Sequence, residues 1–138
     1  VLSSLENRNS SFEMGWSKGQ ELFQGKKESL KSFFGANPFH DIPINDKEIE
    51  ERFPALTSPN VWPKENIPEL EPTFKEMGKI ILEVGLLIAG ICDKYLAKKC
   101  PNYEQDCFKR IIATSRCHIA RLLHYYPVQN KDLDSKNL

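Results

Sequence analysis

Residues 68–95, PELEPTFKEMGKIILEVGLLIAGICDKY, are the stretch that decides the fold. Apolar side chains recur along it at intervals of three and four residues, which is the spacing of one face of an α-helix. These residues are Leu70, Phe74, Met77, Ile81, Val84, Ile88, Ile91 and Tyr95. A helix of this length measures about 40 Å. We expect its apolar stripe to be core, and segment 80–91, apolar almost all round, to be covered on more than one side.

The residues after this helix predict a shorter helix at 104–112 and one strand at 119–126. Side chains alternate between the two faces of a strand, so His124 and Tyr126 share one face and Arg121 lies on the other. A lone strand is not stable. Either an edge elsewhere in the chain pairs with it, or the rest of its sheet belongs to residues not given.

The first forty residues predict short helices broken by loops. Two glycines bracket a tryptophan within 15–19, which is typical of a loop. Residues 21–34 are expected to be helical in part, with an interruption at Gly25. The predicted fold class is therefore mainly α, with helices around one long amphipathic helix and a C-terminal β-strand. We treat residues 1–138 as a single domain or a fragment of one.

Prolines divide the segment that precedes the long helix. Asn45 or Asp46 can cap a short helix, which we expect to end at Pro54. Residues 57–68 are rich in proline, and we expect them to form an ordered loop pinned by Trp62.

The composition excludes several classes of partner. Nineteen Lys and Arg residues balance nineteen Asp and Glu residues, so the basic surface that nucleic-acid binding requires is not indicated. The most apolar run is far shorter than the roughly 20 residues that cross a bilayer. The four cysteines form no Cys-x-x-Cys pair, so we expect free, mostly buried thiols. We expect a cytoplasmic protein with neither nucleic acid nor membrane as a partner.

Several short phrases occur in one order along residues 14–127. They are Gly15-Trp16-Ser17-Lys18-Gly19, Ala36-Asn37-Pro38 with Asp41 and Pro43, Asn60-Val61-Trp62-Pro63, Pro68-Glu69-Leu70-Glu71, Cys92-Asp93-Lys94-Tyr95 and Arg121-Leu122-Leu123-His124-Tyr125-Tyr126-Pro127. In this combination the chain resembles the central portion of the isopenicillin N synthase-like branch of the non-haem iron(II), 2-oxoglutarate-dependent oxygenases. The resemblance implies an α+β fold with a double-stranded β-helix (jelly-roll) core and the long helix packed outside it.

The same resemblance implies a co-substrate site on the last strand. His124 and Tyr126 match positions where plant members of the family carry an Asn-x-Tyr step that touches the co-substrate, so they are the candidate cofactor-binding residues. Tyr126 would donate its hydroxyl to a carboxylate of 2-oxoglutarate, and His124 replaces the family's asparagine. Arg121 is the candidate for an anionic group of a small-molecule substrate. The alternatives are a surface ion pair for Arg121 and ordinary hydrogen-bonded pocket residues for His124 and Tyr126.

Family members hold Fe(II) with a His-x-Asp pair and a distant second histidine, which follow the strand at 121–127. The residues given contain no such pair there, so we assign no catalytic residue and no metal ligand to this chain. Fe(II) and 2-oxoglutarate are implied for a complete family member. We expect a segment of such an oxidoreductase. The alternative is a non-catalytic helical module, derived from that family, which binds a partner or a second copy through the apolar helix.

Overall fold

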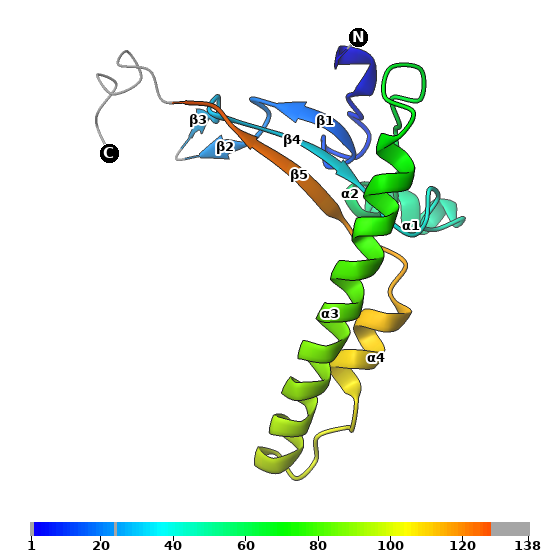
Figure 1. The fold of residues 1–138 in the computed structure, drawn as a ribbon, viewed down its shortest axis with the longest axis vertical. Helices are drawn as coiled ribbons and strands as arrows, with labels where there is room; N and C mark the ends of the chain where they lie inside the picture. Colours follow the sequence, from blue (N-terminus) through cyan, green and yellow to red (C-terminus); the bar gives the residue numbers. More distant parts are fainter. Residues whose placement is uncertain (1, 24, 128–138) are drawn as a thin grey trace.

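The computed structural model describes residues 2–23 and 25–127 and shows a mixed α/β fold (Figure 1). In chain order the elements are the 3-10 helix η1 (Leu2–Leu5), β1 (Gly15–Lys18), β2 (Leu22–Phe23), β3 (Lys26–Lys27), β4 (Lys31–Ala36), α1 (Lys47–Arg52), α2 (Pro54–Thr57), α3 (Leu70–Lys99), α4 (Cys107–Thr114) and β5 (Ala120–Tyr125). The expected long helix and C-terminal strand are both present, but four further segments that were expected to be helix or loop are strands, so the fold is mixed rather than mainly α.

A three-stranded antiparallel sheet, in the order β1-β4-β5, supports the N-terminal half of the molecule. β4 is the central strand, and it supplies the partner that the predicted C-terminal strand lacked. Phe34 of β4 lies opposite Trp16 of β1 on one side and Leu122 of β5 on the other. Short strands β2 and β3 form a separate antiparallel pair.

The prediction of partial helix at 21–34 and of a loop at 15–19 is wrong for a physical reason. Five of the six residues of β4 are buried, and its buried side chains are apolar or small on both faces. The sequence of β4 therefore shows no alternation of apolar and polar residues that would indicate a strand. β1 is only four residues long, and its first residue, Gly15, has a positive φ of 78°. A glycine at this position is typical of a loop, although the chain continues as a strand.

The core lies where the start of α3 crosses the sheet. Phe34, Ala36 and Phe74 are buried together, and half-buried residues pack around them. These are Trp16, Trp62, Leu70 and Ala120. The rings of Phe34, Trp62 and Phe74 lie with their centroids 5.6–6.1 Å apart. Trp62 therefore pins the proline-rich loop before α3, as predicted.

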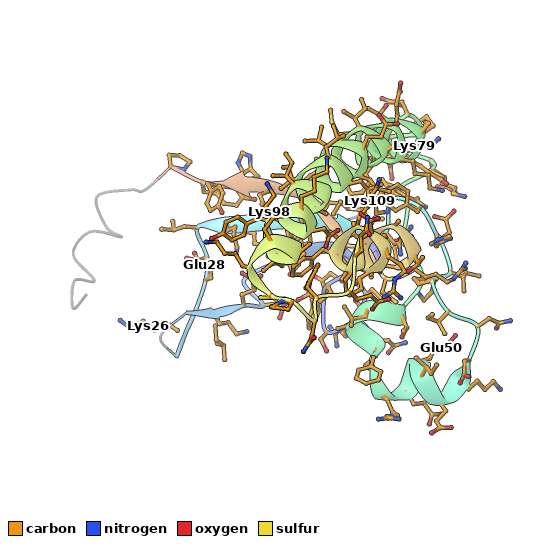
Figure 2. All side chains as sticks on the ribbon, turned by 90° about the horizontal axis from the view of Figure 1, so that it is seen from below. Lys26, Glu28, Glu50, Lys79, Lys98 and Lys109 are labelled. Atoms are coloured by element: carbon orange, nitrogen blue, oxygen red, sulfur yellow. The ribbon has the colours of Figure 1, made fainter. Side chains whose placement is uncertain are left out.

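α3 is the predicted long helix, and it extends four residues beyond Tyr95 to Lys99. Its predicted stripe is only partly core, because Leu70 and Phe74 pack on the sheet while the rest of the stripe is exposed. Six stripe residues, Met77, Ile81, Val84, Ile88, Ile91 and Tyr95, are each more than half exposed. Viewed along α3, α4 lies against one side of the helix, and side chains on the far side project away from the described residues (Figure 2). The described residues therefore do not supply the expected cover on that side of α3.

α4 is fixed to α3 by a buried carboxylate. Its own N-cap residue, Asp106, makes no side-chain capping bond. Instead Asp93 of α3, which is 3% exposed, accepts hydrogen bonds from the amides of Phe108 and Lys109 at 2.9 and 3.0 Å and from the hydroxyl of Tyr103. Asp93 thus satisfies amides that the first turn of α4 leaves open.

The remaining sequence expectations have mixed outcomes. Asp46 caps α1 through the amides of residues 48 and 49, as predicted, but Pro54 also begins the short helix α2. All four cysteines are free. The expectation that they are mostly buried is wrong, because Cys92 and Cys100 are exposed. Within the described residues, no helix is long and apolar enough to cross a membrane.

Candidate functional site

His124 and Tyr126 lie side by side, as the strand alternation predicted. Their ring centroids are 4.7 Å apart, with the two rings at 76° to each other. His124 is exposed at the end of β5, and Tyr126 follows the strand and is half-buried. The amide of Tyr126 donates to the carbonyl of Leu30 at 2.7 Å, which holds Tyr126 beside the start of β4.

Two residues that sequence reasoning missed, Ser32 and Lys18, complete this cluster. Ser32 is buried in β4 directly opposite His124, and its hydroxyl lies 3.2 Å from the Tyr126 hydroxyl. The ammonium of Lys18, in β1 opposite Ser32, lies 3.9 Å from the centre of the Tyr126 ring. Three adjacent strands therefore bring Lys18, Ser32, His124 and Tyr126 to one face of the sheet. We call these four residues the polar cluster.

The polar cluster changes the acidity of one of its own members, Tyr126. The hydrogen bond with Ser32 lowers the pKa of the Tyr126 hydroxyl, the ammonium of Lys18 lowers it further, and desolvation opposes both. Because the two hydroxyls share one hydrogen bond, one of them remains free to donate to a carboxylate, and the Lys18 ammonium and the His124 imidazole can donate as well.

Arg121 lies on the opposite face of β5 from the polar cluster. Its guanidinium forms ion pairs with Glu13 and Glu21 and lies 4.5 Å from the centre of the Phe33 ring. The structure thus brings His124 and Tyr126 together and keeps Arg121 apart from them. These contacts are the surface ion pair that was the alternative to substrate binding by Arg121.

Asp41 ties the loop after β4 to the start of α3. Its carboxylate accepts hydrogen bonds from the Asn60 amide at 2.9 Å, the Trp62 indole at 2.7 Å and the Lys75 ammonium at 2.7 Å. Lys75 also pairs with Glu71 one turn earlier. Burial alone would raise the pKa of Asp41, but these hydrogen bonds outweigh it and lower the pKa to about 2. Asp41 is therefore ionised and structural.

Asn37 performs a related task at the end of β4. Its side chain is fully buried, and its amide donates to the carbonyl of Arg116 at 2.6 Å, while its oxygen accepts from the amides of Phe39 and His40. Its backbone amide also donates to Asn60 at 2.7 Å. Asn37 thereby joins the end of β4 to the segment that enters β5. This contact helps to position β4 and β5, two of the three strands that carry the polar cluster.

The comparisons with known proteins add no assignment. No protein-family model, no curated protein and no solved structure matches the chain.

Proposed function

We propose that this chain is a segment of an iron(II)/2-oxoglutarate-dependent oxygenase, and that the polar cluster receives a carboxylate of 2-oxoglutarate. The observation that carries the proposal is the meeting of Lys18, Ser32, His124 and Tyr126 on one sheet face. Two of these residues are the positions that the family resemblance singled out. The proposal assigns the protein to the cytoplasm, where free thiols stay reduced.

The chemistry of the cluster suits a dicarboxylic acid. Lys18 supplies a compact positive charge, and the hydroxyl of Tyr126 supplies a donor to the ligand when Ser32 donates to Tyr126. Hydrogen bonds to a charged group contribute roughly 1.5–3 kcal/mol each. Because His124 is exposed, the cluster is open to a ligand from solvent.

The described residues do not fit an iron centre. Within residues 2–23 and 25–127, no three His, Cys, Asp or Glu side chains gather as a metal site requires. The proposal therefore gives this part of the protein one task, recognition of the co-substrate, and it places the iron ligands outside the described residues. Under this proposal, further strands of the same sheet would pair with β5, which is an edge strand among the described residues. They would also cover the exposed face of α3.

The test compares two neighbouring tyrosines in the protein with its complete natural sequence. Tyr126→Phe removes the proposed donor, so the KM for 2-oxoglutarate should rise about tenfold or more while kcat changes little. Tyr125→Phe is the matched control, because Tyr125 is 70% exposed and lies on the opposite face. Equal KM values for the two variants would contradict the proposed binding of 2-oxoglutarate at the polar cluster.

The exposed face of α3 favours a second candidate function, a non-catalytic interaction module. Eight of its apolar residues are each more than half exposed: Met77, Ile80, Ile81, Val84, Leu87, Ile88, Ile91 and Tyr95. At 100° per residue they fall within one continuous arc of the helix. Soluble monomers rarely leave so large a contiguous apolar surface open.

Self-association through this face is testable by sedimentation equilibrium. Under this candidate function the chain is a dimer, and Ile88→Glu makes it a monomer because a charge would be buried in the interface. Ile49→Glu, at a 40% exposed isoleucine of α1, is the control and should leave the dimer intact. A wild-type chain that sediments as a monomer would exclude self-association.

A further inference from the structure

Four charged residues of α3 border one edge of its exposed apolar face. At about 100° per residue, Glu76, Glu83 and Lys94 lie within about 20° of one another around the helix, and Lys98 lies about 40° further into the face. All four side chains are exposed, and within the described residues none of them forms an ion pair. Along this edge the two carboxylates come first and the two ammonium groups follow.

The opposite edge of the exposed face carries no charge between residues 81 and 92. It consists of Ile81, Gly85, Ile88 and Cys92. An open apolar hollow of about 250 Å³ lies beside it, between α3 and α4, and three of these four residues line it. The exposed face therefore has one charged edge and one apolar edge. A helix that covers the face must present matching edges to both.

A second copy of α3 meets this requirement when it runs antiparallel to the first. A two-fold axis perpendicular to the helices sets each edge against its own copy, with the chain direction reversed. The carboxylates of one copy then face the ammonium groups of the other, and the two apolar edges meet. A parallel pair would instead set the charged edge of each helix against the apolar edge of the other, which leaves the charges unpaired.

The apolar residues of the exposed face fix the register of such a pair. In one antiparallel register the residues that lie opposite each other are Met77 and Tyr95, Ile81 and Ile91, and Val84 and Ile88. Each of these layers is apolar on both sides. In the same register Glu76 is level with a point between Lys94 and Lys98 of the second copy. The apolar pattern and the charge pattern therefore select the same arrangement.

We propose that α3 pairs with α3 of a second copy of this chain in the antiparallel direction, with Glu76 of each copy between Lys94 and Lys98 of the other. The inference rests on the second candidate function, self-association, and names the partner and the geometry of that interface. Like charges that meet across an interface weaken binding strongly, so the charged edge excludes the competing arrangements.

Charge reversal tests the arrangement. The dissociation constant of the dimer is measured by sedimentation equilibrium on the protein with its complete natural sequence. Glu76→Lys should raise this constant about tenfold or more, because it places like charges together at two symmetric positions. Adding Lys94→Glu and Lys98→Glu to that variant should bring the constant back close to the wild-type value. Glu51→Lys, at an exposed position of α1, is the matched control and should leave the constant unchanged.

A distance between spin labels reports the direction of the pair independently of charge. The four native cysteines are free, so serine can replace them without breaking a disulfide, and Lys99→Cys then carries a single label. In the antiparallel register Lys99 lies opposite Thr73 of the second copy, so the two labels should be about 40 Å apart. A parallel pair would bring them within about 20 Å of each other.

The outcomes separate this inference from the candidate function on which it rests. A wild-type protein that sediments as a monomer would overturn both, and would leave the exposed face of α3 to be covered by further strands. A wild-type dimer that is insensitive to Glu76→Lys, that the two added reversals do not restore, or whose labels lie within about 20 Å would overturn the antiparallel arrangement alone.

Discussion

Gly78 and Gly90 lie in the same helix, yet we predict opposite effects when each is replaced by alanine. A Cβ at Gly78 would lie 2.4 Å from Cβ and 3.0 Å from Cγ of Pro38, in the loop that follows β4. A Cβ at Gly90 would meet only the Cδ of Lys109, at 4.0 Å. The two substitutions gain the same helix propensity, about 1 kcal/mol, so their difference isolates the contact with Pro38.

Overpacking of a well-packed site costs about 1–3 kcal/mol, and a 2.4 Å approach belongs at the upper end of that range. We therefore expect Gly78→Ala to lower the free energy of unfolding by about 2 kcal/mol and Gly90→Ala to raise it by about 0.5–1 kcal/mol. Urea unfolding followed by circular dichroism should separate the two midpoints by roughly 1 M or more. Equal midpoints would refute the packing of α3 against the loop after β4.

Two further predictions concern the carboxylates that hold the helices. The pKa of Asp41 is about 2 in the fold against 3.8 unperturbed, so its contribution is complete at neutral pH and is lost as the pH falls through about 2. Because this carboxylate is 48% exposed, we expect Asp41→Asn to lower the free energy of unfolding by only about 1 kcal/mol at neutral pH. Urea unfolding should show the gap from wild type closing between about pH 4 and pH 2; a gap that is constant with pH would contradict the ionised network. Burial and the hydrogen bond to Asp93 raise the pKa of Tyr103 to about 12. Asp93→Asn should lower the pKa of Tyr103 in an ultraviolet titration and speed hydrogen exchange at the amides of Phe108 and Lys109. An unchanged titration would contradict the capping of α4 by Asp93.

The elements that could be predicted are those with local signals. The apolar period of α3 and the capping carboxylate of α1 both act within a few residues, and both elements were predicted close to their observed bounds. β4 could not be predicted, because a strand buried on both faces carries no alternation. The periodicity of α3 identified an apolar face but carried no information on what covers that face.

The candidate site, too, could be predicted from the sequence only in part. Alternation along one strand is local, and it placed His124 and Tyr126 together. Lys18 and Ser32 reach Tyr126 only through the pairing of β1 with β4 and of β4 with β5, which joins residues up to about a hundred positions apart. Lys18 and Ser32 could have been found only if residues 15–18 and 31–36 had been predicted as strands.

The most direct test of the oxygenase assignment is the fate of 2-oxoglutarate with the protein of complete natural sequence. The protein is supplied with Fe(II), oxygen and 2-oxoglutarate, and succinate is measured over time. The account predicts succinate formation that requires Fe(II) and saturates with 2-oxoglutarate. The absence of succinate formation, together with the absence of 2-oxoglutarate binding in a parallel calorimetric titration, would contradict the account and would leave the interaction module as the function to pursue.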